Sequence, residues 1–87
     1  MYVIEYTKQV KKGLEKLSKK DTQTILDKIE SLATNPRPQG VKALHGNWGG
    51  CYRIRPGDYR IVYNIEDKIL TVYVVKIAHK SVIYQES

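Results

Sequence analysis

Three arginines that lie close together are the side chains of this chain best suited to bind an anion. Arg53, Arg55 and Arg60 occur in the run Cys-Tyr-Arg-Ile-Arg-Pro-Gly-Asp-Tyr-Arg-Ile-Val-Tyr over residues 51–63. A guanidinium group presents a planar fork of N–H donors that fits a phosphate bidentately. Clustered guanidinium groups repel one another unless an anion joins them, so the run indicates a phosphate site. The alternative is a solvated sheet face on which the arginines stack over aromatic rings and pair with surface acids.

Alternation along the run predicts that the three arginines share one surface. Residues 51–55 and 59–65 have the pattern of two strands, joined by a Pro-Gly-Asp turn at 56–58. Successive side chains of a strand point to opposite faces. If the tyrosines and isoleucines of this hairpin pack against helices, the arginines gather on the other face. Lys42, in a short edge strand predicted over 41–44, is expected to contact the same ligand.

The whole composition agrees with a polyanion-binding protein. The chain has 87 residues and a net charge of +6, which favours nucleic acid, an acidic protein or an anionic surface as partner. A single cysteine and two distant histidines form no zinc pattern, so we expect no metal site. A chain of this size has a thin core, so we expect no deep cavity for a cofactor. No leader or membrane-length apolar run is present, which predicts a cytoplasmic protein without membrane contact, built as one domain over residues 1–87.

The elements that must position these residues follow from periodicity. A strand is predicted over 2–6, and Thr7 is expected to cap a helix whose apolar stripe is Val10, Leu14 and Leu17. Asp21 is expected to cap a second helix, which ends before the prolines at 36 and 38. A last strand over 69–77 is apolar on both faces and therefore predicted to lie inside the sheet. The fold class is α+β, in two layers. An N-terminal strand and a helical hairpin pack on a mainly antiparallel sheet of four or five strands.

Short motifs in a specific order resemble one known family. Leu-His-Gly at 44–46, Cys-Tyr-Arg-Ile-Arg at 51–55 and Gly-Asp-Tyr-Arg-Ile-Val-Tyr at 57–63 resemble the central hairpin of the RelE/ParE toxin superfamily. The tail Ile-Ala-His-Lys-Ser-Val-Ile-Tyr at 77–84 is similar to the closing segment of that superfamily, a histidine followed by a basic residue and a later tyrosine. The resemblance covers nearly the whole chain, favours the RelE type, and implies a RelE-like fold.

The resemblance implies the toxin of a type II toxin–antitoxin system. RelE-like toxins cleave translated messenger RNA in the ribosomal decoding site. The expected partners are therefore the ribosome, messenger RNA and an acidic, helical antitoxin in a hetero-oligomeric complex. Motif positions imply that the catalytic residues are Arg53, Arg55, Arg60, Lys80 and Tyr84. The implied RNA contacts are Arg53, Arg55, Arg60 and Lys42. Well-studied members have lysines at the two hairpin positions and an arginine in place of Lys80.

Chemistry assigns different roles to these side chains. The 2′-hydroxyl of RNA attacks the adjacent phosphate without a metal, and Arg60, helped by Arg53 and Arg55, would stabilise the added negative charge. Arginine transfers protons poorly because its pKa exceeds about 12. Lys80 is therefore expected to protonate the leaving 5′-oxygen. Tyr84 is expected to orient the 2′-hydroxyl, stack on a base or relay a proton. The general base is left open.

Two aromatic side chains outside this set are interpreted from their places in the chain. Strand alternation turns His79 away from Lys80, so His79 is expected to be structural. Trp48 either anchors its loop against the sheet or serves as a platform for base stacking, and we expect the anchor.

Two other functions remain open at this point. One is a ParE-like inhibitor of DNA gyrase, which would act by protein binding. The other is a basic RNA-binding module without catalysis, whose binding would survive mutation of Tyr84.

Overall fold

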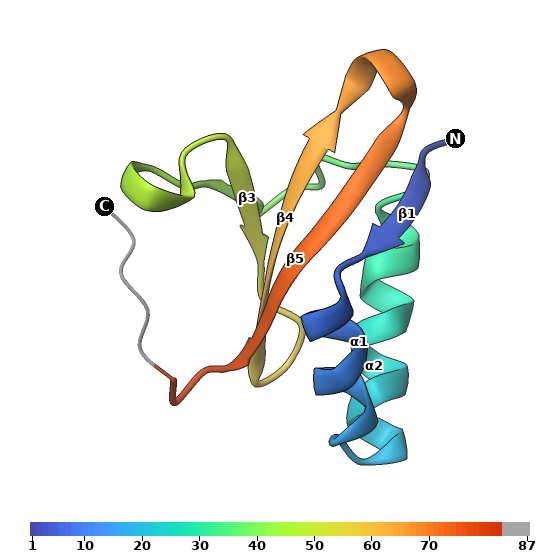
Figure 1. The fold of residues 1–87 in the computed structure, drawn as a ribbon, viewed down its shortest axis with the longest axis vertical. Helices are drawn as coiled ribbons and strands as arrows, with labels where there is room; N and C mark the ends of the chain where they lie inside the picture. The colour runs from blue at the N-terminus through green and yellow to red at the C-terminus, as the bar shows by residue number, and fades with distance from the viewer. Residues whose placement is uncertain (83–87) are drawn as a thin grey trace.

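Five strands and two helices form the two predicted layers. The structure is a computed structural model and describes residues 1–82, so Tyr84 lies outside the described part. The strands are β1 (Val3–Tyr6), β2 (Lys42–Ala43), β3 (Cys51–Ile54), β4 (Tyr59–Glu66) and β5 (Thr71–His79). Their order in the sheet is β1-β5-β4-β3-β2; β1 pairs with β5 in parallel and the other neighbours are antiparallel. Helices α1 (Lys8–Glu15) and α2 (Lys19–Ser31) lie on one side of the sheet (Figure 1).

Polar caps set the start of both helices. The Thr7 side chain accepts a hydrogen bond from the Val10 amide, as predicted for α1. The prediction that Asp21 caps the second helix was wrong, because Ser18 is the cap and accepts from the Asp21 amide. Asp21 instead lies in the first turn, where its negative carboxylate interacts favourably with the positive end of the helix dipole. The same carboxylate accepts a hydrogen bond from the Tyr59 hydroxyl.

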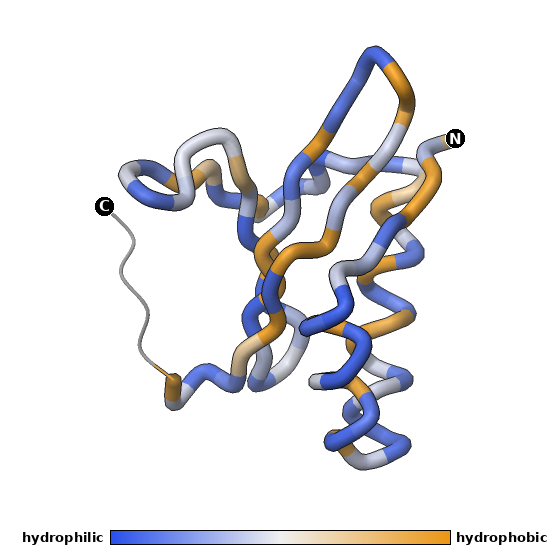
Figure 2. The backbone as a smooth tube through the Cα atoms, viewed as in Figure 1, coloured by the Kyte–Doolittle hydropathy of each residue, from blue (hydrophilic) through white to orange (hydrophobic). Residues whose placement is uncertain are grey.

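The main core lies between the helices and the sheet. Its buried side chains come from α1, α2, the C-cap residue of α2 and the last three strands. They are Val10, Ile25, Ile29, Leu32, Ile54, Ile61, Tyr63, Val72 and Val74. Apolar stretches run through the middle of β4 and β5, while the helices alternate apolar and polar residues (Figure 2). The predicted helical face of the hairpin is thereby confirmed, since Tyr52, Ile54, Ile61 and Tyr63 all belong to this core or pack against it.

The last strand begins and ends two residues later than predicted. Residues Asp67–Ile69 form a short 3-10 helix, and Leu70 has a left-handed φ of 48°, so the strand starts at Thr71. Its interior position between β1 and β4 is confirmed. No helix of residues 1–82 is both long and apolar enough to span a membrane.

A β-bulge divides β5 into two halves of opposite parity. Tyr63 pairs with Val74 but Val62 pairs with Lys76, which leaves Val75 as an extra residue. Before the bulge, Val72 and Val74 face the helices. After it, Ile77 faces them and Lys76 turns to the opposite face. The bulge therefore decides which basic residue of β5 can join the arginines.

A polar cluster ties the β4–β5 turn to the loop after α2. The Arg37 guanidinium donates to both Asp67 carboxylate oxygens, at 3.2 and 2.9 Å, and the Tyr2 hydroxyl donates to the same carboxylate at 2.6 Å. The hydrogen bonds from Arg37, and then the one from Tyr2, lower the pKa of Asp67 from 3.8 to about 2. The cluster joins segments that are far apart in sequence.

Candidate active site

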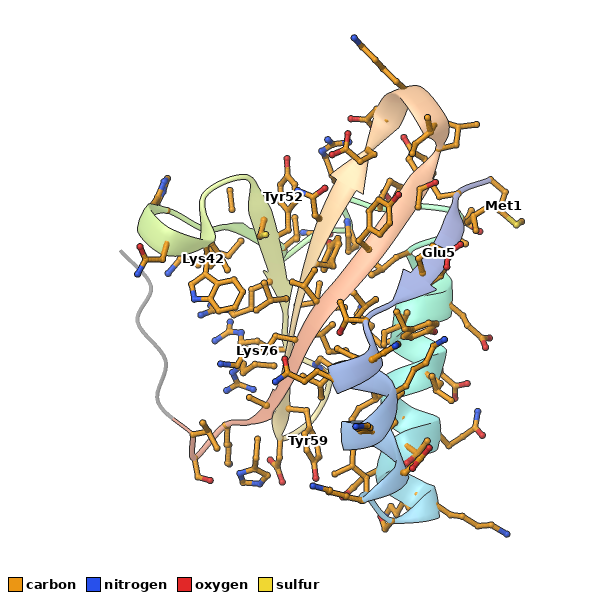
Figure 3. The ribbon with its side chains drawn as sticks, in the orientation of Figure 1. Met1, Glu5, Lys42, Tyr52, Tyr59 and Lys76 are labelled. Carbon is orange, nitrogen blue, oxygen red and sulfur yellow. The ribbon has the colours of Figure 1, made fainter. Side chains whose placement is uncertain are left out.

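Basic side chains from four strands, β2 to β5, meet on the sheet face opposite the helices. Lys42, Arg53, Val62 and Lys76 are consecutive partners across β2, β3, β4 and β5, so their side chains point to the same face. Figure 3 shows Lys42 and Lys76 on the side of the sheet away from α1 and α2. Arg60 lies two residues before Val62 on β4 and pairs with Ala78, which places it on this face as well. We call Lys42, Arg53, Arg60 and Lys76 the cationic face.

The spacing of these residues allows their charged ends to meet on one anion. Neighbouring strands lie about 5 Å apart, so Arg53 and Lys76 stand roughly 10 Å apart across β4. Arg60 lies roughly 7 Å further along β4 from their row. Arginine and lysine side chains are long enough to bring charged ends from such positions together on a phosphate.

An apolar floor supports the cationic face. Val62 is fully buried and Leu44 nearly so, yet neither belongs to the core under the helices. Arg53, Arg60 and Lys76 are all half-buried. Long basic side chains can cover apolar surface with their aliphatic stems while the charged head stays near solvent. Such packing restricts the side chains before a ligand arrives and lowers the entropy lost on binding.

Particular contacts direct the charged ends. The Arg60 Nη1 atom donates to the Tyr59 carbonyl at 2.9 Å. The Lys76 ammonium lies 5.4 Å from the centre of the Trp48 ring, within range of a cation–π interaction. Trp48 is half-buried, as expected of a loop anchor.

Arg55 and Lys80 lie at the turn end of this surface. Arg55 follows the last residue of β3 and is exposed. The Lys80 amide donates to the Asp58 carbonyl at 2.7 Å, which continues the ladder beyond His79 and Tyr59. The Lys80 ammonium also pairs with the Asp58 carboxylate at 3.3 Å. Lys80 is therefore held beside the turn. It lies two residues after Ala78, the ladder partner of Arg60, so alternation places it on the same face of the sheet as Arg60.

His79 lies on the helix side, as predicted. Its partner in the ladder is Tyr59, and their rings meet edge to face with centres 5.3 Å apart. The Nδ1 atom accepts a hydrogen bond from the Ser81 amide at 3.1 Å. These contacts fix the ring away from the cationic face.

Other reactive groups of the described chain contribute no comparable site. Burial raises the pKa of the Cys51 thiol, which disfavours the nucleophilic thiolate. Within residues 1–82, no three His, Cys, Asp or Glu side chains lie close enough together to hold a metal ion.

The structure thus brings together Lys42, Arg53 and Arg60, with Arg55 and Lys80 at the edge of the same surface. Sequence reasoning missed Lys76. The available signal was a lysine in an otherwise apolar strand, but simple alternation puts residue 76 on the helix face with Val72 and Val74. Only the bulge at Val75 reverses that parity. Tyr84 falls outside the described residues.

Comparisons with known proteins agree with the fold. The family model described as the ParE toxin of the type II toxin–antitoxin system, parDE, matches residues 4–84. The chain is 31% identical to Toxin RelE of Mycobacterium tuberculosis, over 97% of this chain and 87% of that protein. It is 27% identical to Toxin RelG of the same organism, over 97% of each chain.

A solved structure gives the same result. A chain of the archaeal RelE–RelB complex from Pyrococcus horikoshii OT3 superposes with a TM-score of 0.81 at 30% identity, covering 94% of this chain and 98% of that chain. The family resemblance seen in the motifs is confirmed: the chain belongs to the RelE/ParE superfamily of type II toxin–antitoxin toxins and is of the RelE type.

Proposed function

We propose that this toxin is a ribosome-dependent endoribonuclease that cleaves translated messenger RNA in the cytoplasm and so inhibits translation. The observation that carries the proposal is the cationic face, where Arg53, Arg60 and Lys76 share one surface over a buried apolar floor. Preorganised cations of this kind stabilise charge that develops during a reaction, because they need little rearrangement when the charge appears.

The reaction needs no external nucleophile. The 2′-oxygen of the ribose attacks phosphorus, its proton is removed, and the bond from phosphorus to the 5′-oxygen breaks. The products are a 2′,3′-cyclic phosphate and a 5′-hydroxyl end. Arg60, with Arg53 beside it, stabilises the extra negative charge on the phosphoryl oxygens. The ribosome supplies alignment of the RNA, which can be worth several kcal/mol.

Proton transfer is assigned to residues at the end of β5 and beyond. Lys80 protonates the leaving 5′-oxygen; its contacts with Asp58 hold it at the turn between β3 and β4. Arg55 contributes charge at the same end. Tyr84 orients the 2′-hydroxyl or stacks on a base, a role that rests on its motif position alone.

An antitoxin is the proposed protein partner. The P. horikoshii structure that this chain resembles is a complex of RelE with RelB. A net charge of +6 favours an acidic partner, and an acidic amphipathic helix could cover basic and apolar surface together. We propose a hetero-oligomeric complex in which the antitoxin neutralises the toxin.

The deciding experiment maps the ends of a translated message after addition of the purified toxin to a translation system. We expect new 5′-hydroxyl ends within codons in the decoding site. Arg60→Ala and Tyr84→Phe should abolish most of these ends, whereas Lys68→Ala should leave them unchanged, because Lys68 lies in the β4–β5 turn. An intact message in the presence of folded wild-type protein would refute the proposal.

Inhibition of DNA gyrase is the second candidate, since the matching family model is described by the ParE toxin. It predicts gyrase-linked DNA breaks with undamaged message. Cultures that express the toxin can be scored for cut message and for DNA breaks, so one experiment separates the two functions.

A further inference from the structure

A pocket adjoins the cationic face beside the part of β5 that follows Val74, where the pairing with β1 has ended. It has a volume of about 330 Å³ and is lined by α1, β5 and the loop before β3, through Gln9, Val10, Gly13, Trp48, Val75, Lys76 and Ile77. This volume is at the lower end of the range of small-molecule sites, about 300–1,000 Å³. The pocket and the cationic face share Lys76, so a ligand in one is next to a ligand on the other.

The loop that carries Trp48 is built to hold the indole in one place. Gly46 and Gly50 both have left-handed backbone, with φ of 64° and 86°, a conformation that glycine adopts at low cost. The Asn64 side chain donates to the Gly50 carbonyl at 3.0 Å and ties the loop to β4. The Trp48 ring thus forms an aromatic wall of the pocket, 5.4 Å from the Lys76 ammonium.

Gly13 lines the opposite wall of the pocket and places no side chain in it. It lies inside α1, where glycine is less favourable than alanine. No described heavy atom lies within 4 Å of the point where its Cβ would stand, apart from its neighbours and its own helix backbone. A larger side chain at this position would therefore project into the pocket rather than clash with the core.

We propose that this pocket binds one nucleobase of the RNA whose phosphate lies on the cationic face, a site that rests on the proposed function. Every base has a π-face, so Trp48 can stack on it without regard to sequence. The Gln9 side chain offers both a donor and an acceptor and can read a base edge. Lys76 both lines the pocket and belongs to the cationic face, so its ammonium can pair with the adjoining phosphate.

The chain provides its own probe for this site. Trp48 is the only tryptophan, so tryptophan emission of the intact toxin reports on the pocket alone. We would titrate the toxin with a short single-stranded RNA, with the same RNA carrying one abasic position at each place in turn, and with inorganic polyphosphate. Anisotropy of a labelled RNA, displaced by each competitor, measures overall binding in parallel.

The expected result is that RNA quenches Trp48 while polyphosphate binds without quenching. One abasic position should remove the quenching and weaken binding roughly 10-fold, the effect of losing one stacked base. Gly13→Leu, which fills the pocket, should have the same effect, and Gly13→Ala, which adds one methyl group, should not. Both substitutions raise helix propensity, so neither should unfold α1. Gln9→Ala should retain the quenching of Trp48 but reduce the difference in affinity among RNAs that carry each of the four bases at the bound position.

Three outcomes would overturn the proposal: RNA that fails to bind or to alter Trp48 emission, equal quenching by polyphosphate, or unchanged quenching in Gly13→Leu. Emission that responds to a peptide of the antitoxin but not to RNA would make the pocket a protein contact. Message cleavage is scored separately. Cleavage without base-dependent quenching would refute the base-binding pocket but not the proposed function. Quenching without cleavage would refute the proposed function but not the pocket.

Discussion

Three basic side chains of the site each have a neighbour that limits where the charge can go. The Tyr59 carbonyl accepts from Arg60, the Trp48 ring faces Lys76, and the Asp58 carboxylate pairs with Lys80. Val62 lies buried between Arg53 and Lys76 in the ladder. The site therefore consists of charges already oriented toward one surface, and substitutions should separate charge from geometry.

Arg60 gives the sharpest test of this distinction. Arg60→Ala should lower kcat for message cleavage about 100-fold, the usual cost of removing one group that stabilises transition-state charge. Arg60→Lys should retain part of the activity because it keeps the charge but loses the bidentate fork. Single-turnover cleavage rates and thermal unfolding would be measured together. Equal rates for Arg60→Ala and wild type, with both folded, would exclude a role in catalysis.

Asp58 tests the effect of the paired acid. The Asp58 side chain is 64% exposed and the Lys80 side chain is 54% exposed, so the ion pair adds at most about 1 kcal/mol to stability. Asp58→Asn should leave the melting temperature nearly unchanged. It should tighten RNA binding roughly 3-fold, because one surface charge that repels phosphate is removed. Anisotropy of labelled RNA gives the affinity, and weaker binding would contradict this prediction.

At the scale of elements, polar contacts fix the start of α2 and the turn of the β4–β5 hairpin. Ser18 begins α2, whose residues Ile25 and Ile29 fill the core. Arg37 and Asp67 fasten the hairpin turn to the loop after α2. The Ser18 cap and the Arg37–Asp67 ion pair stabilise elements that support the sheet, and neither includes a residue of the cationic face.

Ser18→Ala should destabilise the fold by about 1 kcal/mol, because the Asp21 amide loses its side-chain acceptor. For a chain of this size, that corresponds to a melting temperature lower by roughly 4–8 °C. Thr24→Ala is the matched control. Its hydroxyl donates to the Lys20 carbonyl within α2, and alanine is the better helix former. A neutral Ser18→Ala would mean that another residue caps the helix.

Asp67→Asn should remove a pH-dependent part of stability. The pKa of Asp67 is lowered on folding from 3.8 to about 2, so the ionised carboxylate stabilises the folded state above about pH 4. That contribution is lost as pH falls toward 2. Urea unfolding across this range should give wild-type and variant curves that converge at the acidic end. A constant difference at all pH values would contradict the assigned pKa.

At the scale of the whole molecule, the two faces of the sheet have different roles. The helix side holds the main core and the contacts of His79 with Tyr59, while the opposite side holds the cationic face. The net charge of +6 attracts polyanions to the molecule, and the cationic face gives that attraction a direction.

RNA binding should therefore weaken steeply with salt. Neutralising about four phosphates on a single strand gives a slope of roughly −3 for log K against log salt concentration. Lys42→Ala should make the slope shallower by about one, because Lys42 lies in the row with Arg53. Lys68→Ala removes the same charge from the far hairpin turn and should leave the slope unchanged. Equal slopes for Lys42→Ala and wild type would remove Lys42 from the interface.

Local patterns in the sequence were enough to predict both layers and part of the site. Alternation placed Arg53 and Arg60 opposite Ile54 and Ile61, and the ladder confirms it. Thr7 and the first helix were correct for the same reason, since a cap and its helix lie within a few residues. The Asp21 prediction failed because Ser18 and Asp21 both suit a cap, and the choice between them depends on where the preceding turn ends.

The tertiary structure alone decided which residues complete the site. The bulge at Val75 arises from how β5 pairs with β4, and it turns Lys76 from the helix side to the cationic face. The meeting of Lys76 with Trp48 and the pocket beside α1 join segments far apart in the chain. Sequence alone sets periodicity, capping and charge, because these depend on neighbouring residues. Strand register and contacts between distant segments depend on how the whole sheet packs, and no local pattern contains that information.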